Sequence, residues 1–333
     1  MRPFLLFMAL LTNVGGVQAQ YDSTYYTSYA KKLTCRFYFS QKYTTFSFRN
    51  IENGVTLNYK PNTTLNMGVG ATYKWATLNL AYGFGFLNSD SDKGETRYLD
   101  LQWHVFARKF TIDMLGQFYK GFYLDNEKVT KALGHYYTRP DLAIYEIGVS
   151  SQYILNHRRF TYRAAYFQSE WQKKSAGTFL LGAEFYVGQA QADSTIVPKR
   201  VNESAADTKI QQMNFMELGP NLGYAYSLVI RHHFFVTASA STSYTYGINS
   251  VRNINGGQTS TGFGPNTQLK LFAGYNSATW AVSVTYVNSK VVTDSKGSNR
   301  STEINTGNIR ANLVYRFKPG AKTRKALKLI DGK

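Results

Sequence analysis

The amino-acid sequence predicts an all-β protein, a transmembrane antiparallel up-and-down β-barrel of about 12 strands. Long segments alternate apolar and polar side chains with a period of two. These segments have about ten residues or more, the length of a tilted membrane strand, whereas strands of soluble sheets have about 5–6. After the first 20 residues no apolar run is long enough to cross a bilayer as a helix. Strands satisfy their backbone groups in lipid only by closing into a barrel.

The chain begins with the features of a signal peptide. Arg2 supplies the positive charge, residues 4–11 (FLLFMALL) form an apolar core, and residues 17–19 (VQA) resemble a cleavage site. An uncleaved anchor is the alternative, but the apolar run is far shorter than the roughly 20 residues that a spanning helix needs. We therefore expect export by a cleaved signal peptide to the outer membrane of a Gram-negative bacterium.

The remaining chain is rich in Tyr, Phe, Gly, Thr and Asn and has no linker that would divide it. Its only cysteine, Cys35, excludes an intrachain disulfide and lies too far past the cleavage site to carry a lipid anchor. We therefore expect one domain. Its expected parts are a signal peptide (1–19), a periplasmic N-terminal segment (20–43), the barrel (44–317) and a basic C-terminal tail (318–333).

The alternating stripes place apolar side chains on one face of each predicted strand. In residues 74–86, for example, Leu78, Leu80 and Tyr82 share a face, while Asn79 and Ala81 share the other. We expect the first face to meet lipid and the second to fill the lumen. The predicted strands cover residues 64–73, 74–86, 97–107, 110–119, 142–155, 159–169, 177–189, 215–230, 233–246, 265–276, 279–289 and 304–317.

Connections test this assignment, since outer-membrane barrels have short periplasmic turns and longer outer loops. Short turns are expected at residues 108–109, 156–158, 231–232 and 276–277, and long polar loops at 190–213, 247–264 and 290–303. Between the turns near 157 and 231 the count gives three strands, where an even number is required. One run is therefore misassigned, or the barrel has fourteen strands, with 44–50 and 55–59 as the extra ones.

The last predicted strand ends with Leu313, Tyr315 and Phe317 on one face. This resembles the terminal signal that the barrel-assembly machinery recognises during insertion. Four longer segments resemble an uncharacterised outer-membrane family, domain of unknown function 4421. The resemblance implies an exported barrel typical of Bacteroidetes and carries no established activity. The four segments are residues 57–88, 98–124, 160–182 and 218–235.

One pair of side chains suggests chemistry. If Arg108 and Lys109 form a two-residue turn, His104 lies directly across from Asp113 on the lumen face. A histidine oriented by a carboxylate is part of a hydrolytic triad. We favour a hydrogen-bonded lumenal pair, because no nucleophile motif is visible, and keep the catalytic role as a weak hypothesis.

Three further charged residues, Glu146, Arg163 and Glu184, fall on predicted lumen faces, where such groups brace a closed barrel or set the field of an open one. The adjacent His232 and His233 point to opposite faces and do not make a paired metal site. The sequence has no CxxC set, no HExxH motif and no phosphate-binding glycine loop. No metal and no cofactor are expected.

The formal net charge of the chain is +18. An exported barrel seldom meets nucleic acid, so the expected anionic partners are outer-membrane lipid and lipopolysaccharide, with a periplasmic protein partner for the basic tail. The function that we expect is non-enzymatic, a narrow pore or a structural barrel. The alternatives are a barrel-embedded lipid or glycan hydrolase and an assembly or binding role through the loops and the tail.

Overall fold

The computed structural model describes most of the chain between Tyr21 and Thr323. The expected signal peptide and most of the basic tail lie outside the described residues, so those two predictions stay predictions. Among the residues described, no helix is long and apolar enough to cross a membrane. The described residues are 21–50, 56–74, 76–87, 91–196, 210–253, 256–294, 300–321 and 323.

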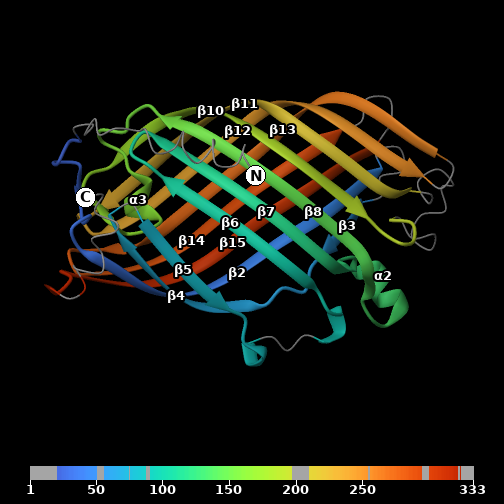
Figure 1. The fold of residues 1–333 in the computed structure, drawn as a ribbon, viewed down its shortest axis with the longest axis horizontal. Helices are drawn as coiled ribbons and strands as arrows, with labels where there is room; N and C mark the ends of the chain where they lie inside the picture. Colours follow the sequence, from blue (N-terminus) through green and yellow to red (C-terminus); the bar gives the residue numbers. More distant parts are fainter. Residues whose placement is uncertain are drawn as a thin grey trace.

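Thirteen antiparallel strands form one sheet that closes on itself (Figure 1). Ten of them make a closed ring in the order β2, β15, β14, β13, β12, β11, β10, β8, β7 and β3, and β4, β5 and β6 lie outside this ring. The predicted fold class is therefore confirmed. The strands are β2 (Leu33–Asn50), β3 (Thr56–Lys60), β4 (Leu65–Tyr73), β5 (Ala76–Tyr82), β6 (Arg97–Phe106), β7 (Phe110–Leu124), β8 (Tyr137–Ile154), β10 (Ala176–Gln191), β11 (Ile210–Ile230), β12 (Phe234–Asn253), β13 (Gly256–Asn276), β14 (Trp280–Asp294) and β15 (Arg300–Phe317).

The number of strands around the barrel changes along its length, because β3 and β4 pair with different parts of β2. β3 pairs with Phe46–Arg49, and β4 pairs with Thr34–Gln41. At the end of the barrel that carries the short turns at 107–109, 231–233 and 277–279, here called the short-turn end, β4, β5 and β6 take the place of β3 in the wall. Counted in this way, the wall there contains twelve strands, but they are not the twelve predicted ones, because β2 is among them and the segment 159–169 is not.

The barrel begins earlier in the chain than expected. β2 starts at Leu33 and pairs with β15 along its whole length, from Leu33 opposite Phe317 to Asn50 opposite Arg300. Residues 33–43 thus belong to the barrel wall and not to a separate N-terminal segment. The alternation is blurred in this strand because Gln41 interrupts the outward stripe of Phe37 and Phe39, and because the aromatic Tyr38 lies on the lumen face.

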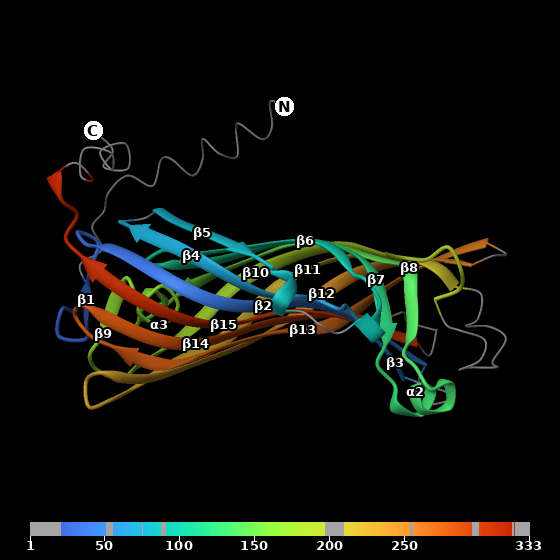
Figure 2. The ribbon, with the colours of Figure 1, turned by 90° about the horizontal axis from the view of Figure 1, so that it is seen from below.

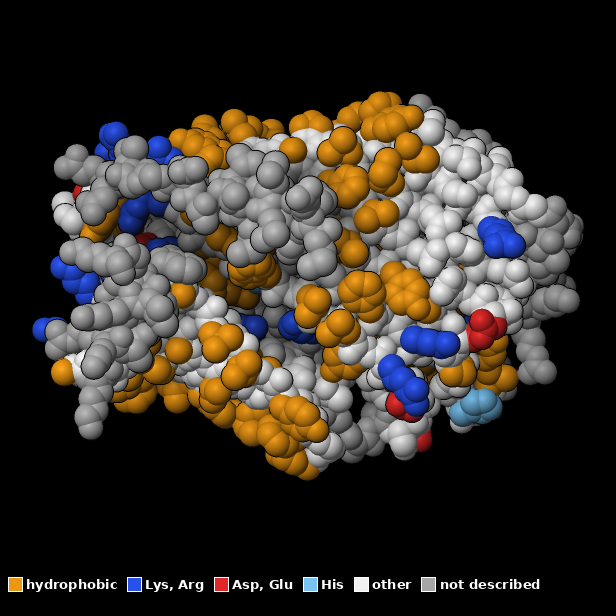
Figure 3. Space-filling model, in the orientation of Figure 1, with side chains coloured by type: hydrophobic (Ala, Val, Ile, Leu, Met, Phe, Trp, Pro, Cys, Tyr) orange, Lys and Arg blue, Asp and Glu red, His pale blue; other side chains and the backbone are white. Residues whose placement is uncertain are grey.

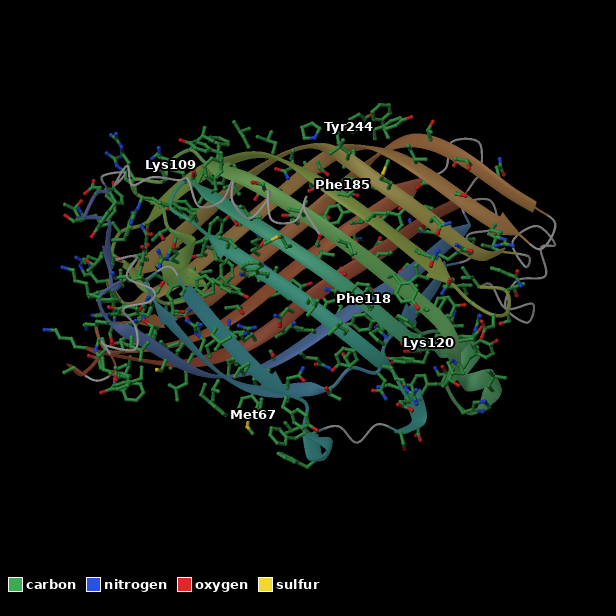
Figure 4. All side chains as sticks on the ribbon, viewed as in Figure 1. Met67, Lys109, Phe118, Lys120, Phe185 and Tyr244 are labelled. Atoms are coloured by element: carbon green, nitrogen blue, oxygen red, sulfur yellow. The ribbon has the colours of Figure 1, made fainter. Side chains whose placement is uncertain are left out.

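The outer face carries the apolar side chains and the inner face the polar ones, as the alternation predicts. Phe179, Leu218 and Val284 are more than half exposed on the outside, whereas Thr237 and Thr285 are buried inside. Figure 4 shows Lys109 and Lys120 toward opposite ends of β7, with Phe118 and Phe185 between these levels. The barrel therefore presents an apolar belt of the kind that faces lipid.

The strands extend beyond this belt at the end opposite the short turns, here called the far end. The predicted loop 247–264 is wrong: β12 and β13 continue through it and pair as far as Asn253 opposite Gly256. The polar outward residues there, such as Ser250 and Thr261, obscure the strand pattern because they lie past the apolar belt. Outside the lipid, a paired strand has no need of an apolar face.

The predicted strand 159–169 is also wrong. This segment enters the lumen at the short-turn end and forms helix α3 (Tyr162–Ala165), whose N-terminus is capped by Thr161, followed by β9 (Glu170–Gln172), which pairs with β1 (Tyr26–Ser28). Most of its side chains are buried, polar ones such as Thr161 and Gln168 included, so they do not show the alternation of a membrane strand. Without this segment, the number of strands between the turns near residues 157 and 231 is even, since only β10 and β11 lie between them.

Two clusters of buried apolar side chains lie at the two ends of the lumen. Figure 2 shows α3 together with β1 and β9 at one end of the barrel and β3 at the other. At the short-turn end, Tyr162 and Tyr166 of the α3 segment pack against Phe106 and Phe272 of the wall. At the far end, Phe48 and Tyr59 belong to a second cluster. The remaining elements are the helix α2 (Glu127–Leu133) and two short 3₁₀ turns, η1 (Gly85–Leu87) and η2 (Ser91–Lys93).

Candidate functional site

The barrel wall is interrupted between β5 and β6. Among the described residues, β5 pairs only with β4, and β6 pairs only with β7. Nearer the far end the wall is closed by β3 and β7, which pair through Tyr59 opposite Leu124 and Lys60 opposite Tyr123. The gap between β5 and β6, here called the seam, is therefore a window in the short-turn half of the wall (Figure 1).

A cavity of about 430 Å³ occupies the seam. Leu78 and Asn79 are neighbours on β5 and point to opposite faces of the sheet, yet both line this cavity. Trp103 and His104 do the same on β6. A space that touches both faces of two strands passes through the wall at their edges, so this side cavity connects the lumen with the lipid-facing surface.

The outer rim of the side cavity is apolar. Leu78 and Trp103 are each 64% exposed, and Leu80 and Leu101 beside them are more than half exposed. In Figure 3, Lys and Arg side chains lie deeper, between the apolar side chains of this wall. The cavity thus changes from apolar at the lipid face to charged in the lumen.

Arg310 of β15 forms the inner end of the side cavity, on the lumen face of the neighbouring wall. Its guanidinium carbon lies 4.3 Å from the ring centroid of Tyr38 and 5.9 Å from that of Tyr166. Only 9% of Arg310 is exposed, and its side chain donates to no acceptor among the described residues. Burial raises the pKa of Tyr166, so this ring stays neutral beside the cation.

The other charges around the side cavity are compensated or hydrogen-bonded. Lys42 lies 3.1 Å from Asp100, whose carboxylate also accepts from the Tyr119 hydroxyl at 2.6 Å. Arg36 on β2 donates to Asn79 at 2.9 Å and to Thr72 and the Phe167 carbonyl, without a carboxylate. The lumenal end of the cavity therefore carries an excess of positive charge.

The predicted pair of His104 and Asp113 is present. The two residues are direct cross-strand partners, and the distance between His104 Nδ1 and Asp113 Oδ1 is 2.6 Å. Lys270, which the sequence analysis did not select, lies 2.5 Å from the other carboxylate oxygen. The apolar neighbours Leu269 and Leu271 would have placed Lys270 on the lumen face. His104 Nε2 is buried without a partner. A catalytic role for the pair stays a prediction.

The three other predicted lumen charges do not form one network. Glu146 accepts from Thr306 at 3.1 Å, and Glu184 accepts from Ser243 at 2.6 Å and from neighbouring amides. Arg163 lies on α3 instead of a strand and donates to the Lys74 carbonyl at 2.6 Å. In the described part of the chain, no group of three or more His, Cys, Asp or Glu side chains is placed to hold a metal ion.

A family model matches residues 20–317. The chain belongs to the family described as domain of unknown function 4421 (DUF4421). This match spans all the strands of the barrel and both sides of the seam. A search of curated proteins found no match to the sequence.

Several solved outer-membrane barrels are similar to this DUF4421 chain at low identity. The outer membrane protease OmpT of Escherichia coli is 10% identical with a TM-score of 0.39, over 87% of this chain and 98% of its own. The toluene transporter TodX of Pseudomonas putida is 8% identical (TM-score 0.28; 87% and 91%). OmpT of Vibrio cholerae is 11% identical (TM-score 0.27; 86% and 99%). Similarities this distant transfer no activity to this chain.

Proposed function

We propose that this DUF4421 protein is an outer-membrane barrel of a Gram-negative bacterium, exported by a cleaved signal peptide, that binds an amphipathic molecule entering sideways from the bilayer. The observation that carries the proposal is the side cavity, which passes through the wall at the unpaired edges of β5 and β6. The lipid-facing belt around the barrel supports a place in the membrane.

A solute pore along the barrel axis fits the structure less well. The α3 segment and its aromatic partners fill the short-turn end, and the cluster around Phe48 and Tyr59 fills the far end. Two other cavities at lumen-facing residues have volumes of only about 20 and 30 Å³, room for about a water molecule each. The side cavity is much larger and opens toward lipid.

An amphipathic ligand would also lower the energetic cost of the unpaired strand edges at the seam. Strand edges facing hydrocarbon leave backbone N–H and C=O groups unpaired, at a cost of several kcal/mol each. A polar head group or the water that accompanies it satisfies such groups, while an acyl chain covers Leu78 and Trp103. The volume of the side cavity falls within the range of ordinary ligand pockets.

Native mass spectrometry of the detergent-purified protein tests the proposal. We expect a bound molecule of lipid mass on the wild-type chain and its loss in Ala81→Trp, which fills the side cavity from β5. The matched control is Ala183→Trp on the exposed face of β10, which should keep the ligand. If wild type retains and takes up no amphiphile, or if Ala81→Trp binds as well as wild type, the proposal fails.

A lipid hydrolase is the second candidate, and one observation favours it. His104 lines the side cavity, is oriented by Asp113, and has a buried Nε2 without a partner. Such a nitrogen can take a proton from a water molecule that attacks a bound ester. Release of fatty acid from phospholipid vesicles by wild type, and its loss in folded His104→Ala, would establish this activity.

A further inference from the structure

The cation at the inner end of the side cavity is unusual among the buried cations of the barrel. Lys270 is paired with Asp113, and Arg139 with Asp141. Arg36 and Arg316 donate hydrogen bonds to neutral acceptors. Among the buried Lys and Arg side chains of the described chain, Arg310 alone has neither an ion-pair partner nor a hydrogen-bond acceptor.

An unpaired buried charge is costly, and proteins normally give it a counter-ion. Arg310 is more than nine-tenths buried and lines the side cavity. No carboxylate in the cavity is free to approach it, because Asp100 is held by Lys42 and Tyr119. The missing partner of Arg310 is therefore to be sought in a molecule that enters the cavity.

Two aromatic rings contact the Arg310 guanidinium. Tyr38 and Tyr166 contact it through their rings, which stabilise the cation without using its N–H groups. The N–H groups remain available for a planar, two-point contact with a carboxylate or a phosphate. Arg36, which binds the cavity-lining Asn79 and has no carboxylate, adds to the positive field.

We infer that Arg310 binds the anionic head group, a carboxylate or a phosphate, of an amphipathic molecule whose chain leaves the barrel through the seam. The inference rests on the proposed sideways entry and adds the charge class of the ligand and the residue that selects it. The head group meets Arg310 in the lumen, and the acyl chain passes Leu78 and Trp103 into the bilayer.

Fluorescence titration of the detergent-folded protein with cis-parinaric acid and with its uncharged methyl ester tests the inference. We expect wild type to bind the acid at least tenfold more tightly than the ester. Arg310→Gln should remove this preference by lowering the affinity for the acid, and Arg310→Lys should restore part of the preference. Arg49→Gln, an exposed arginine on β2, is the matched control and should retain the preference.

Competition identifies the source of the head group. Displacement of parinarate by lysophosphatidate in preference to oleate would indicate a phosphate, and the reverse a carboxylate; both support an anion site. Equal binding of acid and ester by wild type overturns the inference and leaves the proposed function standing. If wild type binds neither the acid nor the ester and a dimer is detected instead, both the inference and the proposed function are overturned, because a second copy of the chain would then cover the seam.

If Arg310→Gln does not fold, as judged by the loss of the mobility difference between heated and unheated protein on a detergent gel, the wild-type comparison still decides. The ester lacks the negative charge of the acid and adds one methyl group, so a preference for the acid that persists at high salt indicates a buried cation in the site, because buried pairs are screened much less than exposed ones. No preference, or one that high salt abolishes, would contradict a role for Arg310.

Discussion

Arg310 on β15 and Tyr38 on β2 are diagonal neighbours on the lumen face of two paired strands, with the guanidinium 4.3 Å from the ring centroid. The contact requires closure of the barrel, because β2 and β15 are its first and last wall strands. It places a cation at the lumenal end of the side cavity, where a head group from the bilayer would arrive.

Replacing Tyr38 should weaken the anion site without removing the charge. In Tyr38→Leu, Arg310 loses one aromatic contact, worth about 0.5–2 kcal/mol, so we expect roughly two- to thirty-fold weaker binding of parinaric acid. The methyl ester should bind as it does to wild type. Tyr244→Leu removes a tyrosine that is 63% exposed on the outer face and serves as the control. Unchanged affinity in Tyr38→Leu would mean that Arg310 is held by other contacts.

The folded protein should not conduct ions. The α3 segment and the far-end cluster fill the two ends of the lumen, so planar bilayers containing the protein should stay silent at all voltages tested. Inserted protein must be verified by its gel mobility and by protease protection. Stable and reproducible conductance steps would contradict a filled lumen and would favour the narrow pore expected from the sequence.

Trp103 should report directly on the lipid at the seam. It is 64% exposed on β6 and lines the side cavity, so brominated acyl chains should quench the fluorescence of a chain that keeps only this tryptophan. A chain that keeps only Trp171 is the control, because its indole lies at the short-turn end and donates to the His232 carbonyl. Similar quenching of both would show that Trp103 does not face the bilayer core.

Asp113 should matter more for stability than His104. Asp113→Asn leaves the charge of Lys270 buried and unpaired, and removing one partner of a buried ion pair costs about 3–5 kcal/mol. His104→Gln removes a single hydrogen bond, worth about 0.5–1.5 kcal/mol in a typical case and somewhat more to a charged acceptor. Urea unfolding in detergent, followed by tryptophan fluorescence, measures both. If the two variants lose the same free energy of unfolding, the contact between Lys270 and Asp113 contributes little to stability.

Features that depend on local geometry could be predicted from the amino-acid sequence alone. A period of two assigns each side chain to the lipid or the lumen face whatever its partner strand, so the barrel and its apolar belt were predictable. The pair of His104 and Asp113 was predictable too, because the turn between β6 and β7 is short and sets the register of the whole hairpin.

Which strands meet, and where the wall stays open, depends on contacts that exist only in the folded chain. Residues 160–169 are apolar enough for a strand, but they form a plug that is buried in the lumen. A periodic pattern does not distinguish a face covered by lipid from a face covered by protein. β3 and β4 share one partner strand, which leaves β5 and β6 without each other. The isolation of Arg310 likewise depends on side chains from β2 and the α3 segment. These contacts join residues far apart in the chain, and no local spacing encodes them.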